Sequence, residues 1–341
     1  HEVSVVHPRQ LAYSAPEPPT LRQRLRRKFH SLLMTDSNPT ITWLPVDKRV
    51  QSLFVPSSHS RFLPDSDVLF ATSWHTVNSV LKCPATKGEK CYLIQHYETW
   101  QGRKDLVDAT WRAPLHKVVI AKWLLEKGEE LGCSDLTYIS NAVNHDTYRL
   151  TRPIQNRPRR VAMMFSTEEF KGSRDGLKAL AIARRIFPDL EAVLFSTSRR
   201  QSWVPGWVEY FRNPPQNFIV NEIFGGSSVF LCPSLSEGWG LPPAEAAACG
   251  CAIVSTDNGG IREFLEHRVT GLLSPPADPE SLAENLCLLL ENESLRIRLA
   301  EAGNKYVSQL NWDKSADLME DFVEGVCSLK YEHSQEHSRV L

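Results

Sequence analysis

The sequence predicts an α/β protein of two Rossmann-like domains that face each other across a cleft. In the second half, an apolar run at 229–233 is followed by a loop, a helix-like stretch and a second apolar run at 252–254, the order of a βαβ unit. The 341 residues, 42% of them hydrophobic, can form two separate cores. A polar, basic, proline-bearing stretch at 151–160 is typical of a linker between two domains.

Short apolar runs that end in polar residues occur on both sides of this linker. They lie at residues 68–70, 91–94 and 161–165, and each reads as a buried strand. We expect the first domain over 1–150 and the second over 151–312. Apolar residues then recur at helical spacing in segments 281–290, 293–306 and 314–327. We expect a last helix over 313–330 and a polar, frayed tail over 331–341.

The most informative segment is EGWGLPPAE, residues 237–245, which follows the strand at 229–233. Pro242 and Pro243 suit the first turn of a helix, where amide protons have no partner within the helix, and Gly250 suits the position after its end. The helix start would face the carboxyl end of the strand, where open α/β sheets bind ligands. An anionic ligand fits this place.

Two carboxylates bracket the segment. Glu237 lies in the loop and Glu245 within the helix, about two turns further on. Carboxylates accept hydrogen bonds from hydroxyl pairs, and Gly238 and Gly240 let a ligand approach the backbone. A nucleoside diphosphate sugar has hydroxyls at both ends and a dianion between them. The alternative is a surface loop that leads into a helix with a solvated glutamate.

From Phe230 to about Trp312 the sequence resembles the nucleotide-sugar half of retaining, GT-B-fold glycosyltransferases of family 4 (glycosyl transferases group 1), whose signature is two glutamates separated by seven residues. Further matches follow in the family's order. They are PSLSEG at 233–238, GGIREF at 259–264, TGLL at 270–273 and DPESL at 278–282.

The resemblance implies roles for single residues. Glu237 would contact hydroxyls of the donor sugar, the amides from Gly238 through Trp239 and Gly240 to Leu241 would bind the sugar and the diphosphate, and Glu245 would bind the ribose. It also makes 1–150 the acceptor-side domain and 151–312 the nucleotide-sugar domain, with the last helix crossing back to the first domain.

The likeness continues more loosely upstream. Lys171 follows the strand at 161–165, and by resemblance it would bind the diphosphate, where its charge would neutralise the leaving group. The family usually has an arginine five residues earlier, where this chain has Ser166. The change leaves three readings: weaker diphosphate binding, replacement by another cation such as Arg174, or a different donor chemistry.

In the first half, His96 follows the strand at 91–94, and by resemblance it faces the donor sugar across the cleft. Glu98, Ser73 and Trp74 are further candidates on the acceptor side. The segment ATSWH at 71–75 and the segment QHYE at 95–98 together resemble a subgroup that contains bacterial rhamnosyltransferases. A structural histidine is the alternative for His96.

The first residues, HEVSVV, resemble the family's second strand. The expectation from this is that the first strand and glycine-rich loop of the N-terminal domain are lacking, as in a fragment or incomplete gene model.

Charge is balanced, with 39 basic and 40 acidic residues, so no broad nucleic-acid signature exists. Residues 21–33, LRQRLRRKFHSLL, combine apolar residues at helical spacing with a dense basic face. That pattern is typical of a helix on an anionic membrane. A helix packed on its own domain is the alternative.

The eight cysteines form no CxxC pair, which favours reduced thiols and a cytoplasmic protein. Asp65 and Asp67 form an Asp-x-Asp that follows Pro64, and we interpret it as a turn, so we expect neither a metal nor another cofactor. No apolar run of 18 residues is present. The protein would then be peripheral to the inner face of the plasma membrane, if it contacts a membrane.

Together these features predict a retaining glycosyltransferase that moves a hexosyl or deoxyhexosyl group from a nucleoside diphosphate sugar to a hydroxyl of a polysaccharide or lipid-linked glycan. The alternatives are a phosphorylase-like or epimerase-like GT-B enzyme, and a degenerate sugar-nucleotide-binding protein without turnover.

Overall fold

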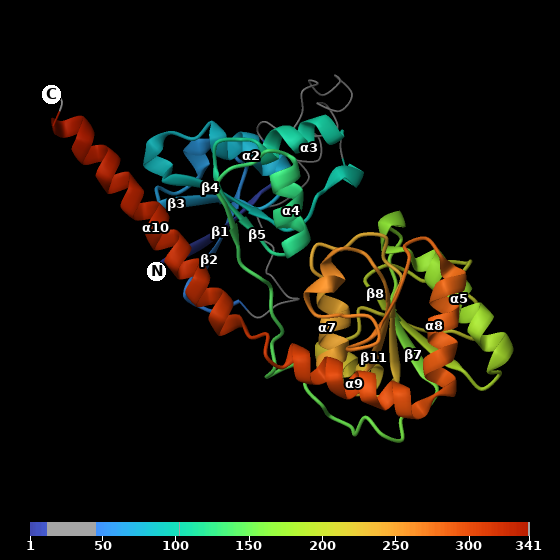
Figure 1. Ribbon diagram of the computed structural model, residues 1–341. Coiled ribbons are helices and arrows are strands. Elements are labelled where there is room, and N and C mark those ends of the chain that lie inside the picture. Colours follow the sequence, from blue (N-terminus) through green and yellow to red (C-terminus); the bar gives the residue numbers. More distant parts are fainter. Residues whose placement is uncertain (12–45, 102, 340–341) are drawn as a thin grey trace.

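The computed structural model describes residues 1–11, 46–101 and 103–339. The basic segment 21–33 therefore lies outside the described residues. Two α/β bodies stand side by side, each built around a parallel sheet, and the chain passes between them near residue 150 and again near residue 310 (Figure 1).

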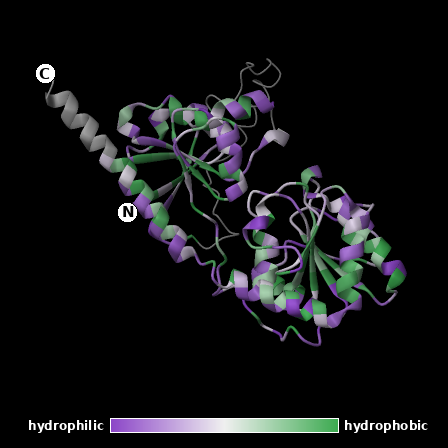
Figure 2. Ribbon diagram, viewed as in Figure 1, coloured by the Kyte–Doolittle hydropathy of each residue, from purple (hydrophilic) through white to green (hydrophobic). Residues whose placement is uncertain are grey.

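The sheet of the second body has six parallel strands in the order β12-β11-β10-β7-β8-β9. Relative to the chain this order is 3-2-1-4-5-6, in which the first and fourth strands of the domain, β7 and β10, are neighbours. Most of its residues are apolar and buried on both faces, as in other parallel sheets that helices cover (Figure 2). The strands are β7 (Arg160–Met164), β8 (Glu191–Ser196), β9 (Glu209–Arg212), β10 (Val229–Cys232), β11 (Ala252–Thr256) and β12 (Leu272–Ser274).

Helices cover both faces of this sheet. On one face α5 packs against α8, and on the other α7 packs against α9 (Figure 1). The elements between the strands are η4 (Glu169–Lys171), α5 (Ser173–Ile186), α6 (Gln216–Phe218), the π-helical turn η5 (Ile219–Phe224), α7 (Leu241–Ala248) and η6 (Gly260–Glu263). The helices α8 (Pro279–Glu291) and α9 (Glu293–Val307) follow the last strand.

Helix α7 begins and ends where the sequence predicts. Gly240 is its N-terminal cap with φ of 98°, and Pro242 and Pro243 lie in the first turn. At the other end Gly250 has φ of 86°. Its N–H donates to Ala247 O and the next N–H to Ala246 O, both at 2.9 Å, which is a Schellman motif. A glycine is required there because L side chains rarely adopt this backbone conformation.

The first body contains a parallel sheet of order β3-β4-β5-β6 and a separate parallel pair, β1 with β2. The strands are β1 (Val3–Pro8), β2 (Val50–Val55), β3 (Val68–Ala71), β4 (Glu89–Ile94), β5 (His116–Val119) and β6 (Leu136–Tyr138). The helices are η1 (Ser60–Phe62), α2 (Trp74–Leu81), η2 (Ala85–Lys87), η3 (Thr99–Gln101), α3 (Lys104–Trp111) and α4 (Lys122–Glu130).

The last helix, α10 (Trp312–Arg339), runs back along the first body (Figure 1). The Ser315 hydroxyl donates to Ser140 O at 2.7 Å, and the Phe322 ring packs against Phe70. The expected boundary between helix and tail was wrong, because the backbone stays helical through Arg339. The segment 331–339 contains neither glycine nor proline, so nothing in it interrupts a helix.

Candidate active site

The site lies where the strand order of the six-stranded sheet reverses. Strand β7 pairs with β8 on one side and with β10 on the other, so the connections that leave β7 and β10 turn to opposite faces. Such a switch point opens a crevice at the carboxyl ends of the two strands. Lys171 follows β7 and Glu237 follows β10, which explains why residues so far apart in sequence meet.

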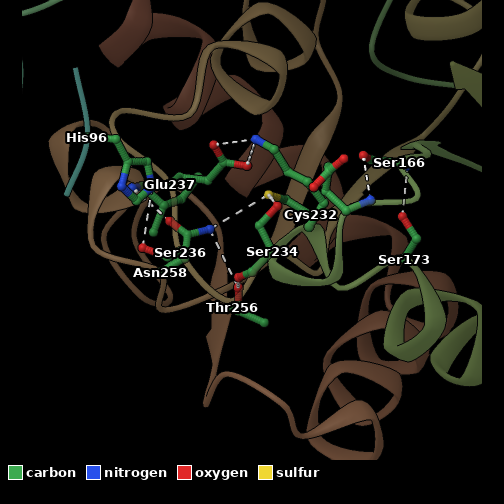
Figure 3. Close-up of polar contacts among 12 residues, drawn as sticks. His96, Ser166, Ser173, Cys232, Ser234, Ser236, Glu237, Thr256 and Asn258 are labelled. Carbon is green, nitrogen blue, oxygen red and sulfur yellow. Dashed lines mark hydrogen bonds and ion pairs between the residues drawn. The ribbon is translucent and has the colours of Figure 1, made fainter. Parts of the chain in front are cut away.

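Lys171 and Glu237 form an ion pair. The ammonium nitrogen lies 2.8 Å from Glu237 Oε1 and 2.9 Å from Oε2, and both carboxylate bonds are drawn in Figure 3. The two side chains are 21% and 9% exposed. Lys171 also lies 5.1 Å from the centre of the Phe170 ring. Both charges are held at the crevice, and bulk water screens them less than it screens charges on an exposed surface.

A second loop holds Glu237 in place. The Glu237 N–H donates to Asn258 O at 3.0 Å, and Gly260 N–H donates to Glu237 O at 3.1 Å. The Asn258 side-chain nitrogen in turn donates to Ser255 Oγ at 3.4 Å, and its Oδ1 accepts from Ile261 N–H at 3.1 Å. This network connects the first glutamate of the signature to the GGIREF segment.

Backbone of the glycine loop reaches the first body. A methyl group on Gly238 would lie 2.0 Å from Gln95 O, so only glycine fits. Trp123 Nε1 donates to Gly238 O at 2.9 Å. At the start of α7 the two prolines have no N–H, so Leu241 is the donor of the first turn. Donors for an anion must otherwise come from the loop before it.

The Trp239 side chain points away from the crevice. Its ring is 2% exposed, donates from Nε1 to Ser140 Oγ at 2.9 Å and packs against Phe264. Only its backbone is therefore available to a donor, which agrees with a role for the amides of this loop.

His96 follows β4 and reaches the same place from the first body. Its Nε2 lies 3.4 Å from Ser236 Oγ (Figure 3). The ring contacts Trp100, Trp123 and Phe170 edge to face, with ring centroids 4.3, 5.5 and 6.3 Å apart. Burial, with a smaller contribution from the nearby Lys171, lowers the pKa of His96 to about 4. At neutral pH the imidazole is uncharged.

Sequence reasoning missed these three aromatic residues. Trp100 and Phe170 stack across the two bodies with ring centres 4.4 Å apart. Phe170 is adjacent to Lys171, and Trp123 is the second residue of the helix after β5, so proximity to a strand end was the available signal. Trp100 lies in a short helical turn that has no such signal.

Glu245 lies in the second turn of α7, next to a residue that sequence reasoning also missed. Burial raises the pKa of Glu245 to about 7, and a hydrogen bond from Tyr148 opposes the shift. The Tyr148 hydroxyl also accepts from Gln216 Nε2 at 3.2 Å. No pattern in the sequence pointed to Tyr148.

The position where the family usually has an arginine holds the uncharged Ser166, and Arg174, the suggested replacement, contacts Trp203 instead of Glu237. The Ser166 hydroxyl accepts from Glu168 N–H at 3.1 Å, and its own N–H donates to Ser173 Oγ at 2.9 Å. The Arg174 guanidinium lies 4.2 Å from the centre of the Trp203 ring, held by a cation–π contact. Within the described part of the chain, Lys171 is the cation bonded to Glu237.

Ser73, Trp74 and Glu98 come together, and they cap a helix. Glu98 accepts from Trp74 N–H at 3.0 Å and from Ser73 Oγ at 3.2 Å, which satisfies the start of α2. Trp74 is only 7% exposed. Their assignment to the acceptor side stays a prediction.

The Asp-x-Asp has a structural partner. Asp65 pairs with Lys87 at 2.8 Å, and the Asp67 carbonyl accepts from Glu89 N–H at 2.8 Å. Among the described residues, the group of three that could hold a metal ion is His1, Glu320 and Glu324, all exposed. Metal independence stays a prediction. None of the described helices is long and apolar enough to cross a membrane.

Part of the chain resembles known glycosyltransferases. Residues 211–306 match the family described as Glycosyl transferases group 1. An uncharacterized glycosyltransferase of Methanocaldococcus jannaschii is 34% identical over 87 residues, 26% of this chain and 25% of the relative. A D-inositol 3-phosphate glycosyltransferase of Xylanimonas cellulosilytica is 35% identical over 108 residues, 32% of this chain and 26% of the relative.

Solved structures resemble more of the chain. Sucrose-phosphate synthase from Thermosynechococcus elongatus has a TM-score of 0.65 at 16% identity, over 77% of this chain and 74% of that one. HepE of Anabaena in complex with UDP-glucose has a TM-score of 0.63 at 15% identity, over 77% and 79%. At these identities the likeness concerns the fold, which is GT-B.

The segment 211–306 of the second body therefore resembles the group 1 glycosyltransferases. The aligned segment spans about a quarter of the length of the curated relatives, so the activity of the whole protein is a matter for proposal.

Proposed function

We propose that this protein is a retaining glycosyltransferase of family 4 that transfers a hexosyl or deoxyhexosyl group from a nucleoside diphosphate sugar to a hydroxyl of a polysaccharide or lipid-linked glycan. The observation that carries the proposal is the Lys171–Glu237 pair at the switch point. It sets a cation for the diphosphate beside a carboxylate for the sugar, at the edge where α/β sheets bind nucleotides.

Each part of the donor has a partner in this proposal. Lys171 and the amides of residues 238–241 bind the diphosphate, Glu237 accepts from hydroxyls of the sugar, and Glu245 accepts from the ribose. HepE, whose fold is similar, is known in complex with UDP-glucose, which supports a nucleoside diphosphate sugar as the donor class.

The chemistry needs no side-chain nucleophile. The bond between the sugar's anomeric carbon and the diphosphate oxygen breaks, and the acceptor oxygen bonds to that carbon on the same face. The acceptor's proton passes to the departing phosphate oxygen. Lys171 stabilises the charge that develops on that oxygen. His96 and its aromatic neighbours Trp100, Trp123 and Phe170 form a closed wall that excludes water.

One observation favours a second candidate, a sugar-nucleotide-binding protein without turnover. Ser166 stands where relatives in this family usually have an arginine, and Arg174 is held by Trp203. A single cation then neutralises the diphosphate.

The test is a screen of nucleoside diphosphate sugars for thermal stabilisation, followed by turnover assays with the donors that bind. Transfer to a glycan acceptor with the same anomeric configuration, read by NMR of the product, supports the proposal. Inversion of the configuration excludes the retaining mechanism. Stabilisation by donors without transfer or hydrolysis favours the binding protein.

The proposed acceptor suggests where the enzyme works. A lipid-linked glycan is held at a membrane surface, and segment 21–33 has the composition of a peripheral membrane contact. We place the enzyme in the cytoplasm, at the inner face of the plasma membrane, and expect it to work without a metal.

A further inference from the structure

Helix α4 of the first body begins without a cap of its own. Its N-terminal cap is Ala121, which has no side-chain acceptor. Other helices supply this acceptor locally: Asp278 accepts from Ser281 N–H at the start of α8, and Asn292 accepts from Leu295 N–H at the start of α9. A helix start that lacks such an acceptor leaves amide protons without partners.

The first amide of α4, which belongs to Lys122, finds its acceptor in the other body. Glu263, in the GGIREF segment, accepts from Lys122 N–H at 2.6 Å through Oε1. Its Oε2 accepts from the Tyr138 hydroxyl at the end of β6. The Glu263 side chain is buried. One carboxylate of the second body thus binds two elements of the first, and both bonds exist only while the two bodies are together.

The same helix start contacts the loop at 237–240. Trp123, the next residue of α4, donates to Gly238 O and lies over Gly259, where an added methyl group would meet its ring at 3.1 Å. Trp123 also meets His96 edge to face. The cap that Glu263 supplies therefore sets the position of the residue that fixes the Gly238 carbonyl.

We propose that Glu263 is a positioning residue: by capping α4 from the opposite body, it couples closure of the cleft to the geometry of the 237–240 loop. The proposal rests on the proposed function for its effect on turnover. Loss of the carboxylate leaves the α4 start and Tyr138 without their acceptor, so the closed arrangement becomes less populated, and the loop loses its contact with Trp123.

The experiment compares Glu263→Gln and Glu263→Ala with Asp278→Ala. Asp278→Ala removes a helix cap within the second body and so controls for the general cost of losing a cap. We expect kcat/KM for the donor to fall about 10-fold in Glu263→Gln and more in Glu263→Ala, with kcat/KM unchanged in Asp278→Ala. Equal losses in all three variants would overturn the proposal.

A second variant separates positioning from local stability. Ala121→Ser gives α4 a cap from its own body. If Glu263 acts by coupling the bodies, Glu263→Ala with Ala121→Ser recovers thermal stability and does not recover kcat/KM. Full recovery of kcat/KM would show that Glu263 only stabilises a helix, and would overturn the proposal.

A readout without turnover keeps this test separate from that of the proposed function. Small-angle X-ray scattering should give a larger radius of gyration for Glu263→Ala than for the unmodified protein and Asp278→Ala. If no donor is turned over by any variant, the proposed function fails, while the scattering still decides the coupling. An unchanged radius of gyration in Glu263→Ala would contradict it.

Discussion

Lys171 and Glu237 lie 66 residues apart in sequence and share two contacts under 3 Å. The pair joins the ends of the first and fourth strands of one domain, so its geometry depends on the strand order of the sheet. In the proposed complex, Glu237 and the diphosphate of the donor would compete for the Lys171 ammonium. A diphosphate that binds Lys171 must share the ammonium with Glu237, and sugar hydroxyls that bind Glu237 compensate for what the carboxylate loses.

The first prediction concerns Glu237→Gln. The amide keeps the size of the side chain and removes the charge that accepts from sugar hydroxyls. We expect turnover to fall roughly 100-fold, with little change in the affinity for a nucleoside diphosphate that lacks the sugar. Steady-state kinetics and calorimetry measure the two effects. Undiminished turnover would remove Glu237 from the site.

The second prediction concerns neutralisation of the diphosphate. If Lys171 supplies it, activity survives excess EDTA, and Lys171→Ala loses turnover by roughly 100-fold. Lys178→Ala, on an exposed ion pair of α5, is the matched control and should keep its activity. Loss of activity with EDTA and its recovery with Mg²⁺ or Mn²⁺ would contradict metal independence.

The third prediction concerns the membrane. Basic residues near anionic lipid contribute about 1 kcal/mol each, and salt weakens the attraction. Replacing the five basic residues of the segment with glutamine should reduce sedimentation with anionic vesicles at low salt and leave nucleotide affinity unchanged. These residues are Arg22, Arg24, Arg26, Arg27 and Lys28. Equal sedimentation of both proteins, or none of either, would leave 21–33 without a membrane role.

The course of the backbone around the signature could be predicted from the sequence because its cues are local. The apolar run before the segment, the two prolines and Gly250 each restrict the backbone by themselves. Family resemblance then assigned the fold, and the structural neighbours confirm it. The sequence predicts too short an α10, because the polar residues after 330 indicate a tail, although helix formation requires no apolar residues.

The partners of the site residues could not be predicted in the same way. Tyr148 near Glu245, Trp100 on Phe170 and Glu263 on α4 are contacts between segments distant in sequence. Such contacts depend on how two whole bodies pack, and no spacing in the chain encodes them. For the same reason the sequence does not show that Glu98 accepts from Trp74 N–H at the start of α2.

The fourth prediction concerns the stability of the closed wall in acid. The pKa of His96 is about 4 in the folded protein and 6.5 in an unfolded chain. The unfolded state therefore binds the proton more readily, and stability is lost as pH falls from 6.5 through 4. We expect a loss of about 2 kcal/mol by pH 4.5 from this residue. Urea unfolding at pH 7.5 and 4.5 should show a smaller acid loss in His96→Gln, and an equal loss would contradict the prediction.

The last prediction concerns Glu245 and the pH dependence of nucleotide binding. Its pKa of about 7 means that the carboxyl is mostly protonated at pH 6 and mostly ionised at pH 8. Ribose hydroxyls are held more strongly by the ionised form, which accepts through both oxygens. We expect affinity for the nucleoside diphosphate to rise roughly fivefold from pH 6 to pH 8.

Two variants isolate this contribution from titration of the ligand's own phosphate, which all the proteins share. Glu245→Gln removes the titrating group and should flatten the profile to the part that the ligand causes. Tyr148→Phe removes the hydrogen bond that opposes the raised pKa, so the rise in affinity should move to higher pH. Calorimetry at three pH values gives each profile. If Glu245→Gln and the unmodified protein have the same pH profile, the Glu245 carboxyl does not contact the nucleotide.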